Sequence, residues 1–114
     1  MTTAKAIADA TLSQLTDTAG ILHDPCEPKC NEDGVQFKGI FVRNLAALNN
    51  EAPDARYRRF VEVNVDSIWN RSQGPDHGFG QVWSGPVDTP KAGTQSSALD
   101  AFAAVVQMSS AKSK

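Results

Sequence analysis

The chain has 114 residues, with 11 basic and 13 acidic side chains and a formal net charge of −2 at pH 7. This length allows one domain with a modest core of its own. The basic residues are scattered along the chain, which excludes the clustered basic surface typical of nucleic-acid binding. No run of residues approaches the roughly 18 apolar positions that a membrane span needs, so no span is predicted.

The first predicted element is a helix over residues 3–18. Its apolar side chains recur at helical spacing, and Gly20 supplies a stop signal. We therefore expect a helix with one buried face. The opening residues MTTAKAIADATL contain neither a continuous apolar segment nor a small-residue cleavage site, so they do not predict a signal peptide.

A loop is predicted for residues 21–32, which hold two prolines and two cysteines. The helix that follows covers residues 33–49, with a start signal in the residues just before it. Its apolar side chains spread around most of the circumference, and only Gln36 and Arg43, seven residues apart, form a narrow polar strip. A helix of this composition is normally buried on most of its sides.

The third predicted helix covers residues 54–71 and begins with Asp54 as its N-cap. It has one apolar and one polar face, and Trp69 repeats the apolar spacing, which predicts that Trp69 belongs to the core. Residues 73–93 are rich in Gly and Pro and are predicted to form a loop. The helix over residues 54–71 should face solvent on one side only.

The last predicted helix begins at Thr94 or Ser96 and ends near Met108. Only Asp100 and Gln107, again seven residues apart, are strongly polar in its body. The four predicted helices therefore alternate. The first and third have one apolar face, and the second and fourth are apolar on most of their sides. This alternation is expected of all-α proteins built from helical hairpins in two concentric layers, with the polar strips facing a central cavity.

The sequence resembles the C-terminal part of glycoside hydrolase family 76, the α-1,6-mannanases. The resemblance covers residues 20–106 and consists of four blocks in matching order and spacing: GILHDPCEPKCNEDGVQFKGIFVRNLAAL, RYRRFVEVNVDSIWN, GFGQVWSGP and TQSSALDAFAA. The segments FKGIF, RNL and QSSALDA are the most specific. The resemblance implies a toroid of six α/α hairpins, of which residues 1–109 would supply the last part, followed by a disordered tail at 110–114.

The resemblance also implies an activity, the endo-hydrolysis of mannan with retention by two adjacent aspartates, one the nucleophile and the other the acid/base. Retaining chemistry places its two carboxyl groups about 5–5.5 Å apart. The chain contains no Asp-Asp pair. We therefore expect no catalytic residue in this chain and no activity of the chain alone. The resemblance further implies an extracellular or cell-surface parent enzyme.

Cys26 and Cys30 lie four residues apart. A disulfide between them suits the secreted habit of the resembled family, whereas free thiols and a metal site with the neighbouring His23 and Asp24 are the alternatives. One histidine beside a CxxxC spacing is a weak zinc signal. The disulfide is the favoured state, and no metal is predicted.

Five residues are candidates to contact a glycan: Asp33, Gln36, Lys38, Trp83 and Gln95. The first three open the predicted helix at 33–49, where hydrogen-bonding groups near a cavity suit sugar hydroxyls. Each has a plainer alternative, because Asp33 can cap the helix, Lys38 can extend outward, and Trp83 can cover the core. For Trp83 the covering role is slightly favoured over stacking on a pyranose ring.

No phosphate-binding loop, nucleophile elbow or paired metal motif occurs, so no cofactor is predicted. His77 is expected to be an exposed loop residue. The expected partner is α-mannan or a related polysaccharide. The alternatives are a stand-alone inactive module that binds carbohydrate or self-associates through apolar helix faces, and a truncated product without function.

Overall fold

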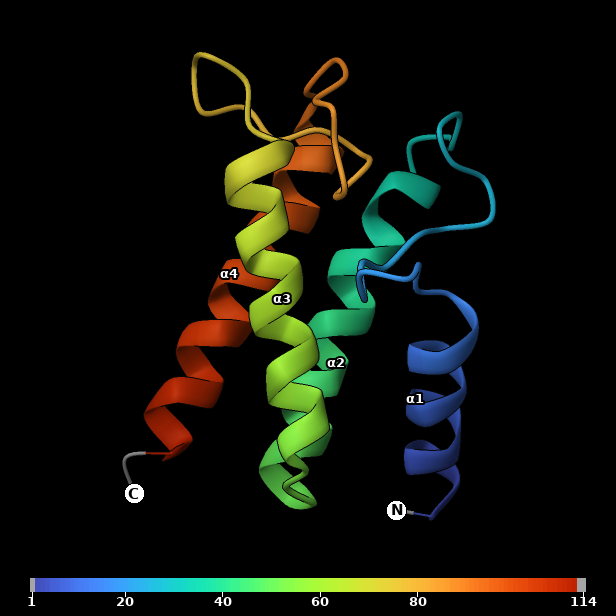
Figure 1. Ribbon diagram of the computed structural model, residues 1–114, viewed down its shortest axis with the longest axis vertical. Helices are drawn as coiled ribbons and strands as arrows, with labels where there is room; N and C mark the ends of the chain where they lie inside the picture. The colour runs from blue at the N-terminus through green and yellow to red at the C-terminus, as the bar shows by residue number, and fades with distance from the viewer. Residues whose placement is uncertain (1, 113–114) are drawn as a thin grey trace.

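The computed structural model describes residues 2–112 and is all-helical, as predicted, with no strand among these residues. The helices run antiparallel to their neighbours in chain order (Figure 1). Their bounds are α1 Thr2–Gln14, the short 3-10 helix η1 Gly34–Gln36, α2 Phe37–Glu51, α3 Ala55–Arg71 and α4 Ala92–Lys112.

α3 is the helix whose bounds were predicted best, because its start signal acts as expected. The Asp54 carboxylate accepts a hydrogen bond from the Arg56 N–H at 2.9 Å. By contrast, α1 ends at Gln14, four residues before the predicted end. The Asp17 carboxylate accepts hydrogen bonds from the N–H groups of Ala19 and Ile21, which favours a turn over further helix.

The predicted helix at 33–49 is split, with a 3-10 turn before α2. α4 extends beyond its predicted end at Met108 and reaches Lys112. The helix thus includes residues 110–112 of the segment that we predicted to be disordered. Residues 113 and 114 of that segment lie outside the described residues.

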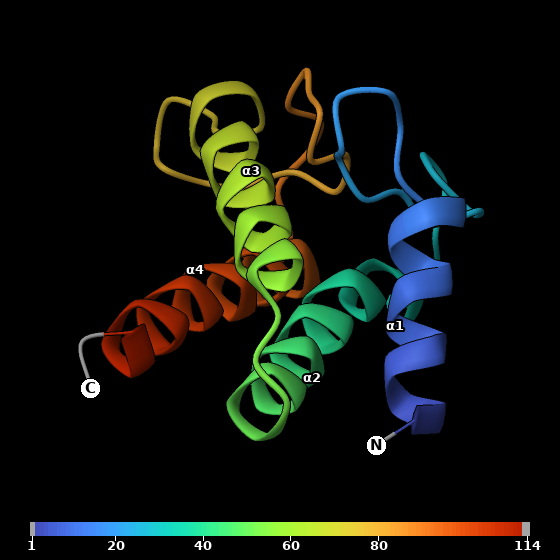
Figure 2. The same cartoon turned by 60° about the horizontal axis from the view of Figure 1, so that its bottom comes forward.

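α2 and α4, the two helices predicted to be enclosed, pack directly against each other. Gly39 makes this approach possible, since a Cβ atom there would lie 2.6 Å from the Cα of Ser97. The Gly39 N–H donates to the Ser97 hydroxyl at 2.8 Å. α3 lies across the junction of α2 and α4, and α1 runs beside α2 (Figure 2).

The connections at the two ends of the bundle differ in length. A short link joins α2 to α3 at one end, whereas the loops of residues 15–33 and 72–91 both lie at the other (Figure 1). We call this end the loop end. Because α2 and α4 both begin there, their first turns carry side chains toward the two long loops.

The core holds the apolar side chains shared by all four helices and both loops. Trp83 and Tyr57 are its largest fully buried members. Several large apolar side chains remain exposed, namely Ile7, Leu15, Phe37, Trp69, Leu99 and Val106. The enclosure predicted for α2 and α4 is therefore incomplete within the described chain.

Trp69 was predicted to be a core residue, and this prediction is wrong: 53% of its surface is exposed. Its ring stacks on His77 with a centroid distance of 6.4 Å and packs edge-on against Phe102. The loop after α3 folds back beside Trp69 instead of burying it. None of the helices among residues 2–112 is long and apolar enough to cross a membrane.

Candidate functional site

The five candidate residues share the loop end. Asp33 and Gln36 lie around η1, Lys38 on the first turn of α2, Trp83 in the loop of residues 72–91, and Gln95 on the first turn of α4. The start of α4 lies against η1, since a Cβ atom on Gly93 would be 3.4 Å from the Gln36 side chain. The fold thus brings together residues that are up to 62 positions apart in the chain.

Asp33 and Gln36 are the accessible members of this group. The Asp33 side chain is exposed and makes no cap hydrogen bond, so the capping role considered for it is wrong. Asn31 caps this turn instead, because its side-chain oxygen accepts a hydrogen bond from the Gly34 N–H at 2.7 Å. The half-buried Gln36 donates weakly to the Glu32 carbonyl at 3.3 Å. Both side chains therefore keep contact with solvent.

Lys38 is buried, with 2% of its side chain exposed, so the outward orientation considered for it is wrong. Its ammonium group pairs with the Glu27 carboxylate at 2.6 Å, donates to the Gln81 carbonyl, and lies 4.7 Å from the centre of the Trp83 ring. Burial lowers the pKa of Lys38, and the charge of Glu27 opposes that shift. Lys38 therefore ties the two long loops together.

Trp83 has no exposed surface and fills the core, which agrees with the covering role. Its carbonyl accepts a hydrogen bond from the Ser67 hydroxyl at 2.8 Å. Gln95 is also engaged, accepting from the Phe79 N–H at 2.8 Å and donating to the His77 carbonyl at 3.2 Å. A buried ring offers no face to a sugar, and Gln95 would have to release loop contacts to bind one.

The two cysteines form a disulfide, with their Cα atoms 5.0 Å apart. The Asp24 carboxylate lies within 4.8 Å of both sulfur atoms. A cysteine binds a metal as the thiolate, and a disulfide provides none. In the structure, Cys26 and Cys30 therefore close the loop covalently, and Asp24 lies beside them.

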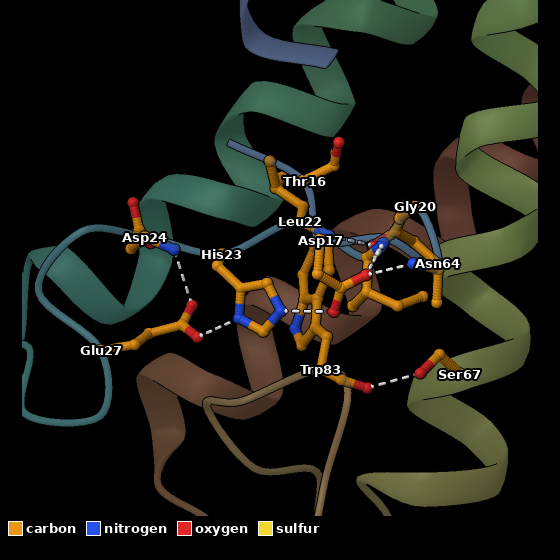
Figure 3. A network of polar contacts seen from close by, with 12 residues as sticks. Thr16, Asp17, Gly20, Leu22, His23, Asp24, Glu27, Asn64, Ser67 and Trp83 are labelled. Atoms are coloured by element: carbon orange, nitrogen blue, oxygen red, sulfur yellow. Dashed lines mark hydrogen bonds and ion pairs between the residues drawn. The ribbon is translucent and has the colours of Figure 1, made fainter. Parts of the chain in front are cut away.

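Charged groups of the loop of residues 15–33 form a network of contacts (Figure 3). The sequence analysis did not predict this network. The His23 ring contacts Asp17 through Nε2 and Glu27 through Nδ1, both at 2.9 Å. Desolvation lowers the pKa of His23, but the hydrogen bonds to these two carboxylates outweigh it and raise that pKa. The signal in the sequence was the mixture of His23 and acidic residues in a loop just before a lysine in an apolar helix.

Among the described residues, the buried atoms Asp24 Oδ2 and Gln81 Nε2 near this network have no hydrogen-bond partner. Burial raises the pKa of Asp24, and the positive charge of Lys38 acts against that change. Glu27 is already paired with two cations, His23 and Lys38. Both oxygens of the Glu27 carboxylate are thus engaged by side chains of this network.

The sequence matches the model of glycosyl hydrolase family 76 over residues 1–114, and the chain belongs to this family. The resemblance inferred from the four sequence blocks is thus confirmed, and the chain is a glycoside-hydrolase-related fragment. No curated protein matches the chain. No solved structure matches it either.

Proposed function

We propose that this chain is the C-terminal part of an endo-acting α-1,6-mannanase that hydrolyses mannan with retention, in an extracellular or cell-surface setting. The match to family 76 over residues 1–114 is the observation that carries this proposal. The chain contributes scaffold and glycan contacts, whereas the acid and the nucleophile belong to the remainder of the enzyme. The absence of an Asp-Asp pair from the 114 residues supports this division.

The proposed architecture is the last part of a six-hairpin α/α toroid, with residues 1–109 as its contribution. The contact between α2 and α4, with α3 across them, supports an inner and an outer layer. The gathering of both long loops at one end supports a glycan cleft there. The disulfide supports an oxidising compartment for the parent enzyme.

Within that cleft we assign two kinds of role to the five candidate residues. Asp33 and Gln36 are accessible and supply hydrogen bonds to sugar hydroxyls. Lys38 and Trp83 are buried and hold the loops that flank the cleft. Gln95 fixes the backbone near Phe79 and reaches a glycan only if the loop moves.

The first test measures whether the purified chain releases reducing ends from an α-1,6-linked mannan. We expect no release, since neither catalytic group is present. Cleavage that survives repeated purification would show that the chain holds an acid and a nucleophile, and the proposed division of roles would be wrong.

The second test measures glycan binding by affinity electrophoresis in a gel that contains α-1,6-mannan. The Asp33→Ala variant is expected to bind more weakly than the unmodified chain. Glu51→Ala is the matched control, because it removes one exposed carboxylate at the opposite end of α2. Equal retardation of both variants would remove Asp33 from the proposed contact surface.

A second function is favoured by the exposed apolar side chains, namely that of a stand-alone module that self-associates. Ile7, Phe41, Leu45 and Leu48 border an apolar groove of about 290 Å³ between α1 and α2. Exposed apolar surface of this kind promotes association. Light scattering after size-exclusion chromatography tests this second function. A stable dimer supports self-association, whereas a monomer that unfolds cooperatively contradicts it.

A further inference from the structure

Four charged side chains of alternating sign form a series from the surface into the core: Asp17, His23, Glu27 and Lys38. Side-chain exposure falls from 36% and 32% for the first two to 7% and 2% for the last two. The series begins in the turn after α1 and ends on α2 (Figure 3 shows its first three members). From Lys38 it continues to the Gln81 carbonyl in the other long loop.

The geometry at His23 requires a charged ring. Both ring nitrogens lie 2.9 Å from carboxylate oxygens. An ionised carboxylate only accepts hydrogen bonds, so each nitrogen must carry a hydrogen, and only the imidazolium carries both. A neutral ring keeps one of the two bonds and turns a lone pair toward the other carboxylate.

Glu27 transmits the state of His23 to the buried end of the series. One of its oxygens faces His23, and the other faces Lys38 at 2.6 Å and the Asp24 N–H at 2.8 Å. A shift of Glu27 therefore disturbs a lysine that is almost fully buried. The charges of Asp24 and Asp88 also act on Lys38.

Residues 20 and 22 of the same loop are also held by a side chain that does not titrate. Asn64 on α3 accepts from the Leu22 N–H at 2.9 Å and donates to the Gly20 carbonyl at 3.1 Å. These contacts contain no titratable group. A change in protonation should therefore affect the segment from His23 onward and spare the contacts before it.

We propose that His23 is a pH-sensitive clamp that locks residues 23–30 onto α2 and, through Glu27 and Lys38, onto the loop of residues 72–91. The clamp is closed while the ring is charged and the carboxylates of Asp17 and Glu27 are ionised. It opens locally when the ring loses its proton, and Asn64 keeps residues 20–22 in place. This inference is independent of the glycan and of the parent enzyme's reaction.

The direction of the pH effect follows from the two surface groups. The pKa of His23 is raised, so its contribution is complete below its ordinary value of 6.5 and is lost as pH rises through the raised value. Desolvation acts to raise the pKa of Asp17, but hydrogen bonds from His23 and two backbone N–H groups leave it lowered. The clamp is thus closed in mildly acidic solution and opens as pH increases.

Nuclear magnetic resonance on the 114-residue chain tests the proposal with two amides. The chain has two histidines, and the His77→Gln variant leaves only the His23 ring signal. We expect this ring to titrate above pH 6.5. Between about pH 5 and pH 8, the hydrogen-exchange protection of the Asp24 N–H should fall as the ring titrates, while the protection of the Leu22 N–H stays constant after correction for intrinsic exchange.

The expected fall is about two- to fivefold, as for the loss of one partly exposed ion pair. His23→Gln should abolish the pH dependence at Asp24. If that variant unfolds, Asp17→Asn provides the second comparison and should move the midpoint to lower pH. Equal behaviour of the two amides, a midpoint below 6.5, or an unchanged transition in Asp17→Asn would overturn the proposal.

Discussion

The two long loops at the same end of the bundle are anchored by different physical means. The loop of residues 15–33 is held by ion pairs through His23 and Glu27 and by a disulfide. The loop of residues 72–91 is held mainly by neutral hydrogen bonds with Ser67 and Gln95 and by the burial of Trp83. Its charged contacts gather at Gln81, whose carbonyl accepts from Lys38 and whose N–H donates to Asp88. Solution pH and redox potential therefore act directly on the first loop and reach the second mainly through Lys38.

Lys38 is the element that the two loops have in common. It pairs with Glu27 of the first loop and donates to Gln81 of the second. A charge this deeply buried is stabilised only by its partners. Lys38, which was predicted to contact substrate, is thus a side chain that connects the two loops.

The largest expected effect comes from Lys38→Met, which removes the buried partner of the Glu27 carboxylate and leaves it with the half-buried His23. Loss of one member of a buried pair costs about 3–5 kcal/mol. Urea unfolding should show a free energy of unfolding lower by that amount. Lys29→Met is the matched control, because Lys29 is exposed in the same loop, and a similar loss in both variants would contradict the buried-pair explanation.

Removal of the disulfide should have the next largest effect. A loop as short as that between Cys26 and Cys30 gives about 2 kcal/mol on the chain-entropy relation. We expect reduction by dithiothreitol, or the double change to Ser, to lower stability and to increase proteolysis within residues 23–30. Cleavage that begins instead in residues 72–91 would mean that the loops are not separately anchored.

Ser67→Ala tests the neutral anchoring of the second loop. It removes the donor to the Trp83 carbonyl, and a typical hydrogen bond contributes about 1 kcal/mol. The loss of unfolding free energy should be the same at acidic and at neutral pH, because no titratable group takes part. A pH-dependent loss would show that this hydrogen bond is coupled to the charged groups around Lys38.

Asp17→Asn should have the smallest effect on global stability, below about 1 kcal/mol, since the Asp17–His23 pair is partly exposed. The pKa of Asp17 is lowered, so its contribution is present above the ordinary value of 3.8 and is lost as pH falls through the lowered value. Unfolding curves at neutral pH should separate the variant from the unmodified chain. Curves in strong acid should coincide, and a difference that grows in acid would reverse the assigned sign.

The helices could be predicted from the sequence where local signals and periodicity agree. α3 has both an N-cap at Asp54 and a clear amphipathic face, and its observed bounds follow the prediction closely. α1 was predicted too long, because Asp17 favours a turn through its own side chain. Periodicity does not detect such competition between a side chain and the helical backbone.

The candidate site was harder to predict, since its residues meet through irregular loops. Sequence patterns singled out Lys38 but gave no means to place Glu27 beside it. They also assigned Trp69 to the core by its spacing, whereas Trp83, which lies in a loop without periodicity, is the tryptophan that is fully buried. Loop paths depend on tertiary contacts, and helical periodicity carries no information about them.

The contact between Gly39 and Ser97 affects the distance between the starts of α2 and α4 at the loop end. Gly39 lies in the first turn of α2, only three residues after Gln36, and the chain makes a second close approach at Gly93, where a Cβ atom would lie 3.4 Å from the Gln36 side chain. Any larger residue at position 39 would act as a spacer between the two helices. Such a spacer would widen the distance between Gln36 and Gly93, so the size of a single side chain sets the spacing of the two helix starts.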